Sequence, residues 1–305
     1  MASAPAGLAR LRDDGRPQGR PPELQDGLNR YLYHPLAARL ARLLAPTPIT
    51  PNIVSLLGLG LIWAAVAAYV GLGWPEGALL GFLLHATWHV TDGADGDLAR
   101  LKGTSSATGE LVDGVCDYAG HTVMYFAFAF LLDNWIGVWA WPLAAAAGAS
   151  HVAQTNHAET QRRTYLWWAY GVPWLKHARD RGDEVFQEGN WFSATFGWMA
   201  RDYLKLGSAM APGTAAVDAA VAAAAGDPGR TRRIRRLTRA ASRKSLTFQK
   251  ALGANPKTVL IGLSMMLGSP LWFFLVEIFL LNLVLLWSVR HHHACSRRLA
   301  RAVGG

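Results

Sequence analysis

The sequence predicts an all-α integral membrane protein in which six transmembrane helices follow an interfacial amphipathic helix. Hydrophobic residues make up 51% of the 305 residues and charged residues only 17%, whereas about 25% of a typical soluble chain is charged. Several apolar runs are long enough to cross a hydrocarbon core of about 30 Å. Lysines and arginines exceed acidic residues by 30 to 21, a net charge of +9. They gather between and beyond the apolar runs, as they do in cytoplasmic loops of membrane proteins.

The composition also indicates which classes of binding partner to expect. In a soluble chain a net charge of +9 would suggest nucleic acid. Here the positive charge accompanies membrane spans, so we expect contact with membrane lipids and no nucleic-acid partner. The two cysteines, Cys116 and Cys295, exclude a disulfide scaffold.

The segment before the first span divides into two parts. Residues 1–27 lack the apolar stretch of a signal peptide and are expected to form a flexible cytoplasmic tail. Residues 28–48 are expected to form the interfacial amphipathic helix, because leucines such as Leu36 and Leu40 recur at helical spacing with arginines between them. Pro35 is expected to kink this stretch or to start its main helical part.

Residues 49–157 are expected to contain the first four transmembrane helices. Each has an apolar run of about 20 residues, which is the length that a bilayer requires. The four runs cover approximately residues 53–72, 76–100, 110–132 and 135–153. The fourth helix is expected to continue beyond the membrane through His157 and Glu159.

The rest of the chain is expected to form a basic cytoplasmic loop (158–253), two further spans (254–290) and a basic cytoplasmic tail (291–305). The loop lacks a run long enough to span, and its arginines place it, like both termini, in the cytoplasm. Two crossings must therefore follow it, which gives six. Within the loop, the alanine-rich stretch 209–225 is interpreted as a helix or a linker. The arginine-rich stretch 230–244 is interpreted as a solvated helix or a lipid-surface anchor.

Four aspartates concentrate negative charge at the end of the second span and the start of the third. Asp92 and Asp95 are three residues apart, and Asp113 and Asp117 are four apart, so each pair shares a helix face. The second helix approaches the cytoplasm and the third leaves it, so both pairs lie at a similar depth. A single acidic residue at the membrane centre costs about 2.5–3.5 kcal/mol on insertion scales.

The protein supplies too little positive charge to balance these four carboxylates. Arg100 contributes one charge and His121 part of another. The remaining deficit suits hard divalent cations, which favour carboxylate oxygens, and two ions about 3.5–4 Å apart are expected. Nearby glycines have two interpretations: Gly93 allows close helix packing, whereas Gly96 leaves room for a ligand against the backbone.

These residues resemble the signature of the CDP-alcohol phosphotransferase family. The resemblance rests on eight positions at fixed spacing: Asp92, Asp95, Gly96, Ala99, Arg100, Gly109, Asp113 and Asp117. The pair Pro51-Asn52 also resembles the start of the first span of the family. The resemblance implies a six-helix membrane enzyme, usually a homodimer, with a polar cavity open to the cytoplasm. Its substrates would be a CDP-linked alcohol donor and a hydroxyl acceptor, with release of CMP.

The resemblance also assigns roles to these residues. Asp92, Asp95, Asp113 and Asp117 would hold the metal, expected to be two Mg²⁺ or Mn²⁺ ions, and Asp117 would also be the catalytic base. A second group would bind CDP. This group consists of Asn52, Gly96, Ala99, Arg100 and Gly109.

The acceptor is less well defined by the sequence. His157, Arg162 and Arg163, at the cytoplasmic end of the fourth helix, are candidate acceptor-binding residues, because an arginine pair can clamp a phosphate. The alternative is an ordinary charged helix end at the membrane interface.

Three functional hypotheses follow. The first is a phosphotransferase of phospholipid biosynthesis in a bacterial inner membrane, with its active site facing the cytoplasm, that transfers phosphatidyl from CDP-diacylglycerol to a hydroxyl acceptor. The second is transfer of a soluble phospho-alcohol, from CDP-choline, CDP-ethanolamine or CDP-glycerol, to diacylglycerol or ceramide. The third is a divalent-cation transporter. A transporter needs polar residues along several helices, and the first, fifth and sixth spans offer only Asn52, Glu277 and Asn282.

Overall fold

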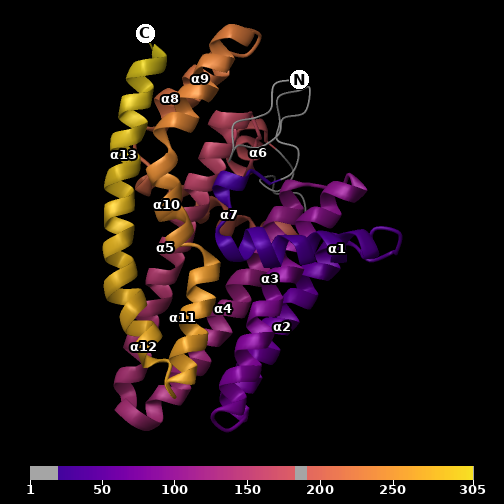
Figure 1. Cartoon of the computed structure of the whole chain (residues 1–305), viewed down its shortest axis with the longest axis vertical. Coiled ribbons are helices and arrows are strands. Elements are labelled where there is room, and N and C mark those ends of the chain that lie inside the picture. The colour runs from indigo at the N-terminus through magenta and orange to yellow at the C-terminus, as the bar shows by residue number, and fades with distance from the viewer. Residues whose placement is uncertain (1–19, 183–190, 305) are drawn as a thin grey trace.

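The computed structural model describes residues 20–182 and 191–304, and all regular elements within these residues are helices. The longest helices run side by side along the long axis of the molecule (Figure 1). These are α2 (Pro51–Gly71), α3 (Glu76–Lys102), α4 (Ala107–Ile136), α5 (Ala140–Tyr170) and α13 (Asn282–Gly304). α13 continues α12 (Leu271–Leu275) through a π-helical turn, Val276–Leu281, and α11 (Ala254–Met266) packs on α3. The all-α prediction is therefore confirmed for the described residues.

Three helical runs in the described residues are long and apolar enough to cross a membrane. They are Pro51–Gly71, Ala107–Tyr170 and Leu271–Val303, and the second of them comprises both α4 and α5. This finding supports an integral membrane protein. α11 has only 13 residues, about 20 Å at 1.5 Å per residue.

The ends of α2, α3 and α4 are defined by local chemistry, and they bring the aspartates together. Thr50 caps α2 by accepting a hydrogen bond from the Ile53 amide, and Ser106 caps α4 by accepting one from the Gly109 amide. Between them, Gly103 ends α3 in the left-handed conformation, with φ of 67°, which glycine adopts without steric cost. The chain reverses here, so the end of α3 and the start of α4 lie close together across a short turn.

α1 (His34–Leu44) lies across the end of α3 rather than along the bundle (Figure 1). Ala37 and Ala41 are fully buried on its inner face, whereas Leu43 is 72% exposed. Pro35 lies in the first turn of α1, and the π-helical segment Asn29–Tyr33 leads into α1 without a break. A Cβ on Gly93 would lie 3.0 Å from the Ala37 Cβ, which supports the interpretation that this glycine allows close packing.

Residues 20–27, expected to belong to a flexible tail, pack against the rest of the protein, whereas residues 1–19 lie outside the described residues. Leu24 is buried, and Glu23 accepts hydrogen bonds from the Tyr165 and Tyr170 hydroxyls. An arginine- and proline-rich composition suggested mobility, but two buried tyrosine hydroxyls and an apolar contact hold this segment.

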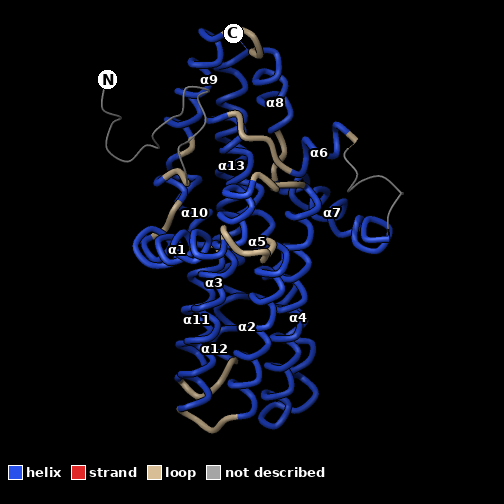
Figure 2. The backbone as a smooth tube through the Cα atoms, turned by 90° about the vertical axis from the view of Figure 1, so that its right-hand side faces the viewer, coloured by secondary structure: helices blue, strands red, loops and turns tan. Residues whose placement is uncertain are grey.

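The segment 158–253 is a helical layer rather than a loop in its described residues. α5 continues to Tyr170, and five helices follow: α6 (Leu175–Arg181), α7 (Trp191–Met210), α8 (Thr214–Ala223), α9 (Pro228–Ala241) and α10 (Arg243–Ala251). α8 and α9 lie beside the C-terminal end of α13, at one end of the molecule (Figures 1 and 2). The alanine-rich stretch is thus a helix. The arginine-rich stretch buries Ile234 in an apolar cluster with Trp168 and Leu299.

The sixth expected span and the expected tail from residue 291 lie on one helix, because α13 continues without interruption to Gly304. Within the three consecutive histidines at 291–293, His292 is buried and stacks on Trp168. This end of α13 is held by packing because its inner face contacts α8 and α9.

Candidate active site

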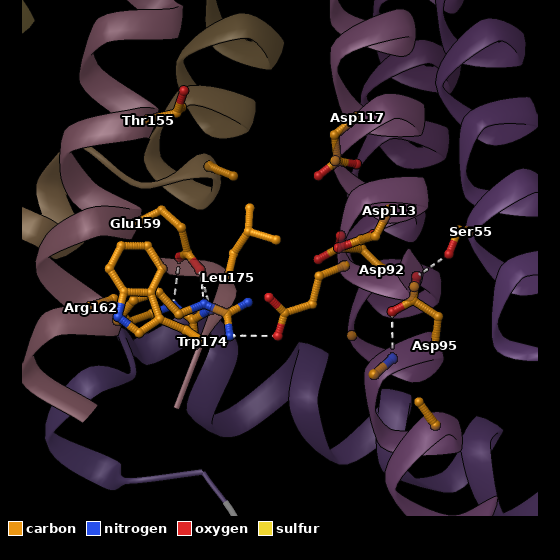
Figure 3. Close-up of a pocket in the computed structure, with 18 of the residues that line it drawn as sticks. Ser55, Asp92, Asp95, Asp113, Asp117, Thr155, Glu159, Arg162, Trp174 and Leu175 are labelled. Carbon is orange, nitrogen blue, oxygen red and sulfur yellow. Dashed lines mark hydrogen bonds and ion pairs between the residues drawn. The ribbon is translucent and has the colours of Figure 1, made fainter. Parts of the chain in front are cut away.

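A cavity of about 1080 Å³ lies where α3, α4 and α5 meet the helical layer. α3 and α4 form one wall and α5 the opposite wall, while residues 20–29, before α1, also line the cavity. Figure 3 shows aspartates on the α3–α4 wall facing Glu159, Arg162 and Trp174 across the space. The two walls differ in charge and in how that charge is paired.

Three carboxylates form the centre of the first wall. One oxygen each from Asp92, Asp113 and Asp117 lies within 4.8 Å of the other two, and all three residues are half-buried. They come from two helices, because α3 supplies Asp92 and successive turns of α4 supply the others (Figure 3). We call these three residues the acid triad.

Asp95 lies beside the acid triad but is held by the protein. Only 6% of this residue is exposed. It accepts hydrogen bonds from the Ser55 hydroxyl at 2.6 Å and from the Gly96 amide at 2.5 Å. The predicted group of four aspartates is therefore a cluster of three and a neighbour that is already hydrogen-bonded.

The two side chains expected to contribute positive charge to this wall, Arg100 and His121, have other partners. Arg100 forms an ion pair with Asp97 at 2.5 Å, and the Nδ1 of His121 donates to the backbone carbonyl of Asp117 at 2.8 Å. Among the described residues, no lysine or arginine forms an ion pair with the acid triad. Three converging carboxylates without a counter-cation fit a hard divalent metal ion, because such ions prefer oxygen ligands.

The opposite wall contains a compact network of paired charges. Glu159 on α5 accepts hydrogen bonds from Arg162 at 2.6 and 2.5 Å and from Arg163 at 2.7 Å. Arg163 also forms an ion pair with Glu110 on α4 at 3.1 Å. This network joins α5 to α4. Trp174 and Leu175 add an apolar surface beside it (Figure 3).

All five residues predicted to bind CDP line the cavity: Asn52, Gly96, Ala99, Arg100 and Gly109. A Cβ placed on Gly96 would be in van der Waals contact with the Arg100 guanidinium, whose Nη1 would lie 3.5 Å away. A Cβ on Gly109 would lie 3.4 Å from the Ser106 Oγ. At both glycines the neighbouring atoms belong to side chains rather than to the backbone.

The predicted acceptor residues fall in two places. Arg162 and Arg163 line the cavity, but both are paired with Glu159. His157 is fully buried outside the cavity lining, and its Nε2 lies 3.0 Å from the Ser288 hydroxyl of α13. The reason is helical phase: His157 follows the cavity-lining Thr155 by two residues, which is a rotation of about 200° at 3.6 residues per turn.

A buried ion pair lies beyond the deep end of the cavity, and the sequence did not predict it. The Lys257 Nζ of α11 is 2.9 Å from a Glu277 oxygen, and these side chains are 2% and 0% exposed. The His151 Nδ1 lies 3.2 Å from the same oxygen, and the Tyr125 hydroxyl donates to the other oxygen. The four side chains come from α4, α5, α11 and the turn before α13.

One signal for this cluster was present in the sequence. Asp113, Asp117, His121 and Tyr125 follow each other at intervals of four along α4, so one helix face carries polar groups from the acid triad to the ion pair. Lys257 directly precedes the apolar run that defined the fifth span, and its partner lies 20 residues further along the chain. Sequence spacing alone does not reveal that contact.

Residues 48–167 match the family model described as CDP-alcohol phosphatidyltransferase. This segment contains α2, α3, α4 and most of α5, and thus the acid triad and all five predicted CDP-binding residues. The family resemblance found in the motif is confirmed over these residues. No curated protein sequence matches the chain.

Proposed function

We propose that this protein is a membrane phosphotransferase that transfers phosphatidyl from CDP-diacylglycerol to a hydroxyl acceptor and releases CMP. The observation that carries the proposal is the acid triad, which lies in a large cavity inside the segment that matches the CDP-alcohol phosphatidyltransferase family. The description of that family, CDP-alcohol phosphatidyltransferase, supports a phosphatidyl donor.

We infer that the acid triad holds Mg²⁺ or Mn²⁺ and that Asp95, which lies beside the triad, supports this site. Two ions would suit a pyrophosphate substrate. A bound divalent cation would neutralise the pyrophosphate and stabilise CMP as it leaves. Ser55 has a supporting role in this scheme, because its hydroxyl fixes the orientation of Asp95.

The nucleotide would bind along the α3–α4 wall at Asn52, Gly96, Ala99, Arg100 and Gly109. The absence of a side chain at the two glycines supports this placement, because it allows close contact between backbone and ligand. Arg100 is exposed enough to turn from Asp97 towards a phosphate, with 56% of its side chain accessible.

Asp117 would act as the general base towards the acceptor hydroxyl. It lies one helical turn deeper than Asp113 on α4, and both face the cavity (Figure 3). A hydroxyl that attacks phosphorus must lose its proton, and a carboxylate within about 2.6–3.2 Å can accept it. The acceptor would then lie between Asp117 and the α5 wall, near Arg162 and Arg163.

We further propose six spans, formed by α2, α3, α4, α5, α11 and α12–α13, with α1 at the interface. The layer of α6–α10 and the cavity mouth would face the cytoplasm of a bacterial inner membrane. The high arginine content of this layer supports that orientation. Labelling of single cysteines introduced into α9 is expected only after the membrane is made permeable to the reagent. Labelling from the outside of intact cells would contradict the orientation.

The packing beyond the ion pair favours an enzyme over a cation transporter. Met124, Phe128, Leu132 and Phe274 are at most 1% exposed and form one apolar cluster with α2 and α11. A transporter needs a polar route to the far side of the membrane. Here the polar face of α4 ends at Tyr125 and apolar side chains follow it.

The test is release of CMP by the purified full-length protein in lipid nanodiscs. CDP-diacylglycerol, CDP-choline, CDP-ethanolamine and CDP-glycerol are each supplied with Mg²⁺ and a panel of acceptors: glycerol phosphate, inositol phosphate, serine and diacylglycerol. CMP release from CDP-diacylglycerol that stops with excess EDTA is the expected result. CMP release from a soluble CDP-alcohol alone would instead support transfer of a soluble phospho-alcohol to a lipid hydroxyl. Full turnover in the presence of EDTA would contradict the metal site.

A further inference from the structure

Residues 20–29, here called the N-terminal strap, connect several elements at the cavity mouth. Glu23 binds the two tyrosine hydroxyls of α5, and the Asn255 amide at the start of α11 donates to Asp26 at 2.8 Å. Gln25 donates to the Arg20 carbonyl at 2.8 Å and accepts from the Nδ1 of His34 at 2.9 Å. The strap is thus bonded to α1, α5 and α11.

The first residue of the strap reaches the wall that carries the acid triad. The Arg20 Nη2 donates to the Gly93 carbonyl of α3 at 2.6 Å and lies 3.3 Å from an Asp97 oxygen. Gly93 directly follows Asp92 of the acid triad. A Cβ at Gly93 would lie 3.3 Å from the Arg20 Nη1, so the absence of a side chain makes room for the guanidinium as well as for α1.

Part of this guanidinium has no hydrogen-bond partner. Its Nη1 is buried and unpaired, although Arg20 lines the cavity. A guanidinium has five N–H donors, and a buried donor without a partner costs about 1–3 kcal/mol. An anionic oxygen in the cavity would remove that cost.

Charged groups of both walls act electrostatically on Arg20. Burial lowers the pKa of its guanidinium, and the charge of Asp97 opposes that shift. The charges of Asp92 on α3 and Arg162 on α5 act on it as well. Arg20 therefore adds positive charge where the proposed donor would carry its pyrophosphate.

We propose that Arg20 is a phosphate-binding residue for the CDP-linked donor, delivered to the cavity by the N-terminal strap. The inference rests on the proposed function for the identity of the donor. Arg20 lies outside residues 48–167, so the strap adds a contact that the matched segment lacks. The ligand class is a nucleoside diphosphate, and the contact is a charge-assisted hydrogen bond to a phosphate oxygen.

The test measures binding of CDP and of CMP to the full-length protein by calorimetry, with saturating Mg²⁺. Arg20→Gln is expected to weaken CDP binding by about 10- to 100-fold, the range for hydrogen bonds to charged groups, and to weaken CMP binding less. Arg20→Lys should keep part of the affinity, because it retains the charge but not the planar fork. The matched control is Arg30→Gln: Arg30 is exposed and stacks on Tyr31, so CDP binding should not change.

A second measurement separates ligand contact from a structural role. If Arg20 contacts phosphate, methylguanidinium added to Arg20→Ala should restore CDP affinity, whereas a strap that only stabilises the fold would not respond. The inference would be overturned if Arg20→Gln bound CDP as tightly as the wild type, or if this variant lost equal affinity for CDP and CMP. It would also be overturned if the wild type did not bind CDP. A wild type that binds CDP but releases no CMP from any donor would contradict the proposed function alone.

Discussion

The acid triad and the Lys257–Glu277 pair are both charged clusters inside the helical bundle, and they differ in how their charge is balanced. Glu277 contacts a lysine, a histidine and a tyrosine, so its two oxygens are satisfied by the protein. Asp92, Asp113 and Asp117 converge on one wall of a cavity, and among the described residues no lysine or arginine forms an ion pair with them. The first cluster is neutralised by its own side chains, whereas the second has the ligand atoms of a metal site.

The two clusters illustrate how buried charges with a structural role differ from buried charges that bind a ligand. A buried ion pair stabilises a specific arrangement of helices, but it contributes little to stability relative to apolar packing. Like charges gathered without a partner oppose folding and are retained for what they bind.

Replacing a member of the acid triad should have the largest effect. Asp92→Asn and Asp113→Asn are each expected to abolish nearly all CMP release while the protein still folds and inserts, because each removes a metal ligand and one repulsive charge. The thermal midpoint of the variant without metal should not fall, and its increase on adding Mg²⁺ should disappear. Near-wild-type turnover in either variant would remove that residue from the metal site.

Asp117→Asn should separate the base from the metal ligands. If Asp117 is chiefly the base, turnover falls by about 10²- to 10⁴-fold while CDP still binds in the presence of Mg²⁺. Calorimetry with CDP and the steady-state rate of CMP release measure the two quantities. Loss of nucleotide affinity together with the metal response would make Asp117 a metal ligand only.

Lys257→Met should destabilise the protein by about 3–5 kcal/mol, because it leaves the Glu277 carboxylate buried and unpaired. The double variant Lys257→Met/Glu277→Gln should recover most of this loss. Thermal unfolding of the purified protein in detergent measures both. A single variant as stable as the wild type would show that the two side chains are not paired in the membrane.

An exposed ion pair of similar length provides the control for burial. Lys205 and Asp202 on α7 are 3.1 Å apart, with 74% and 59% of their side chains exposed. Lys205→Met is expected to change stability by less than about 1 kcal/mol, because water screens such pairs. A loss comparable to that of Lys257→Met in the same unfolding assay would mean that burial does not account for the difference.

The sequence was sufficient for local features and insufficient for contacts between distant helices. Helical periodicity placed α3 and α4 within a few residues, and the spacing of the aspartates predicted two faces that meet. The sequence also suggested an acceptor role for His157, whereas helical phase places this residue outside the cavity lining and beside Ser288. The Lys257–Glu277 pair and the contact of Arg20 with α3 depend on tertiary packing, and neither residue's own neighbours in the chain indicate it.

The Lys257–Glu277 pair also has a consequence for biosynthesis. α11 has 13 residues and carries Lys257, so as the chain emerges it offers the membrane a short segment with an uncompensated charge, which costs about 2.5–3.5 kcal/mol near the bilayer centre. Its neutralising partner is made 20 residues later, beyond the turn at Gly268. α11 is therefore expected to wait at the translocon for α12 and to enter as a hairpin. α11 is short and carries a lysine, so its own hydropathy is weak for an independent span. Insertion together with α12 would account for this, because the two helices would then enter the membrane as one unit.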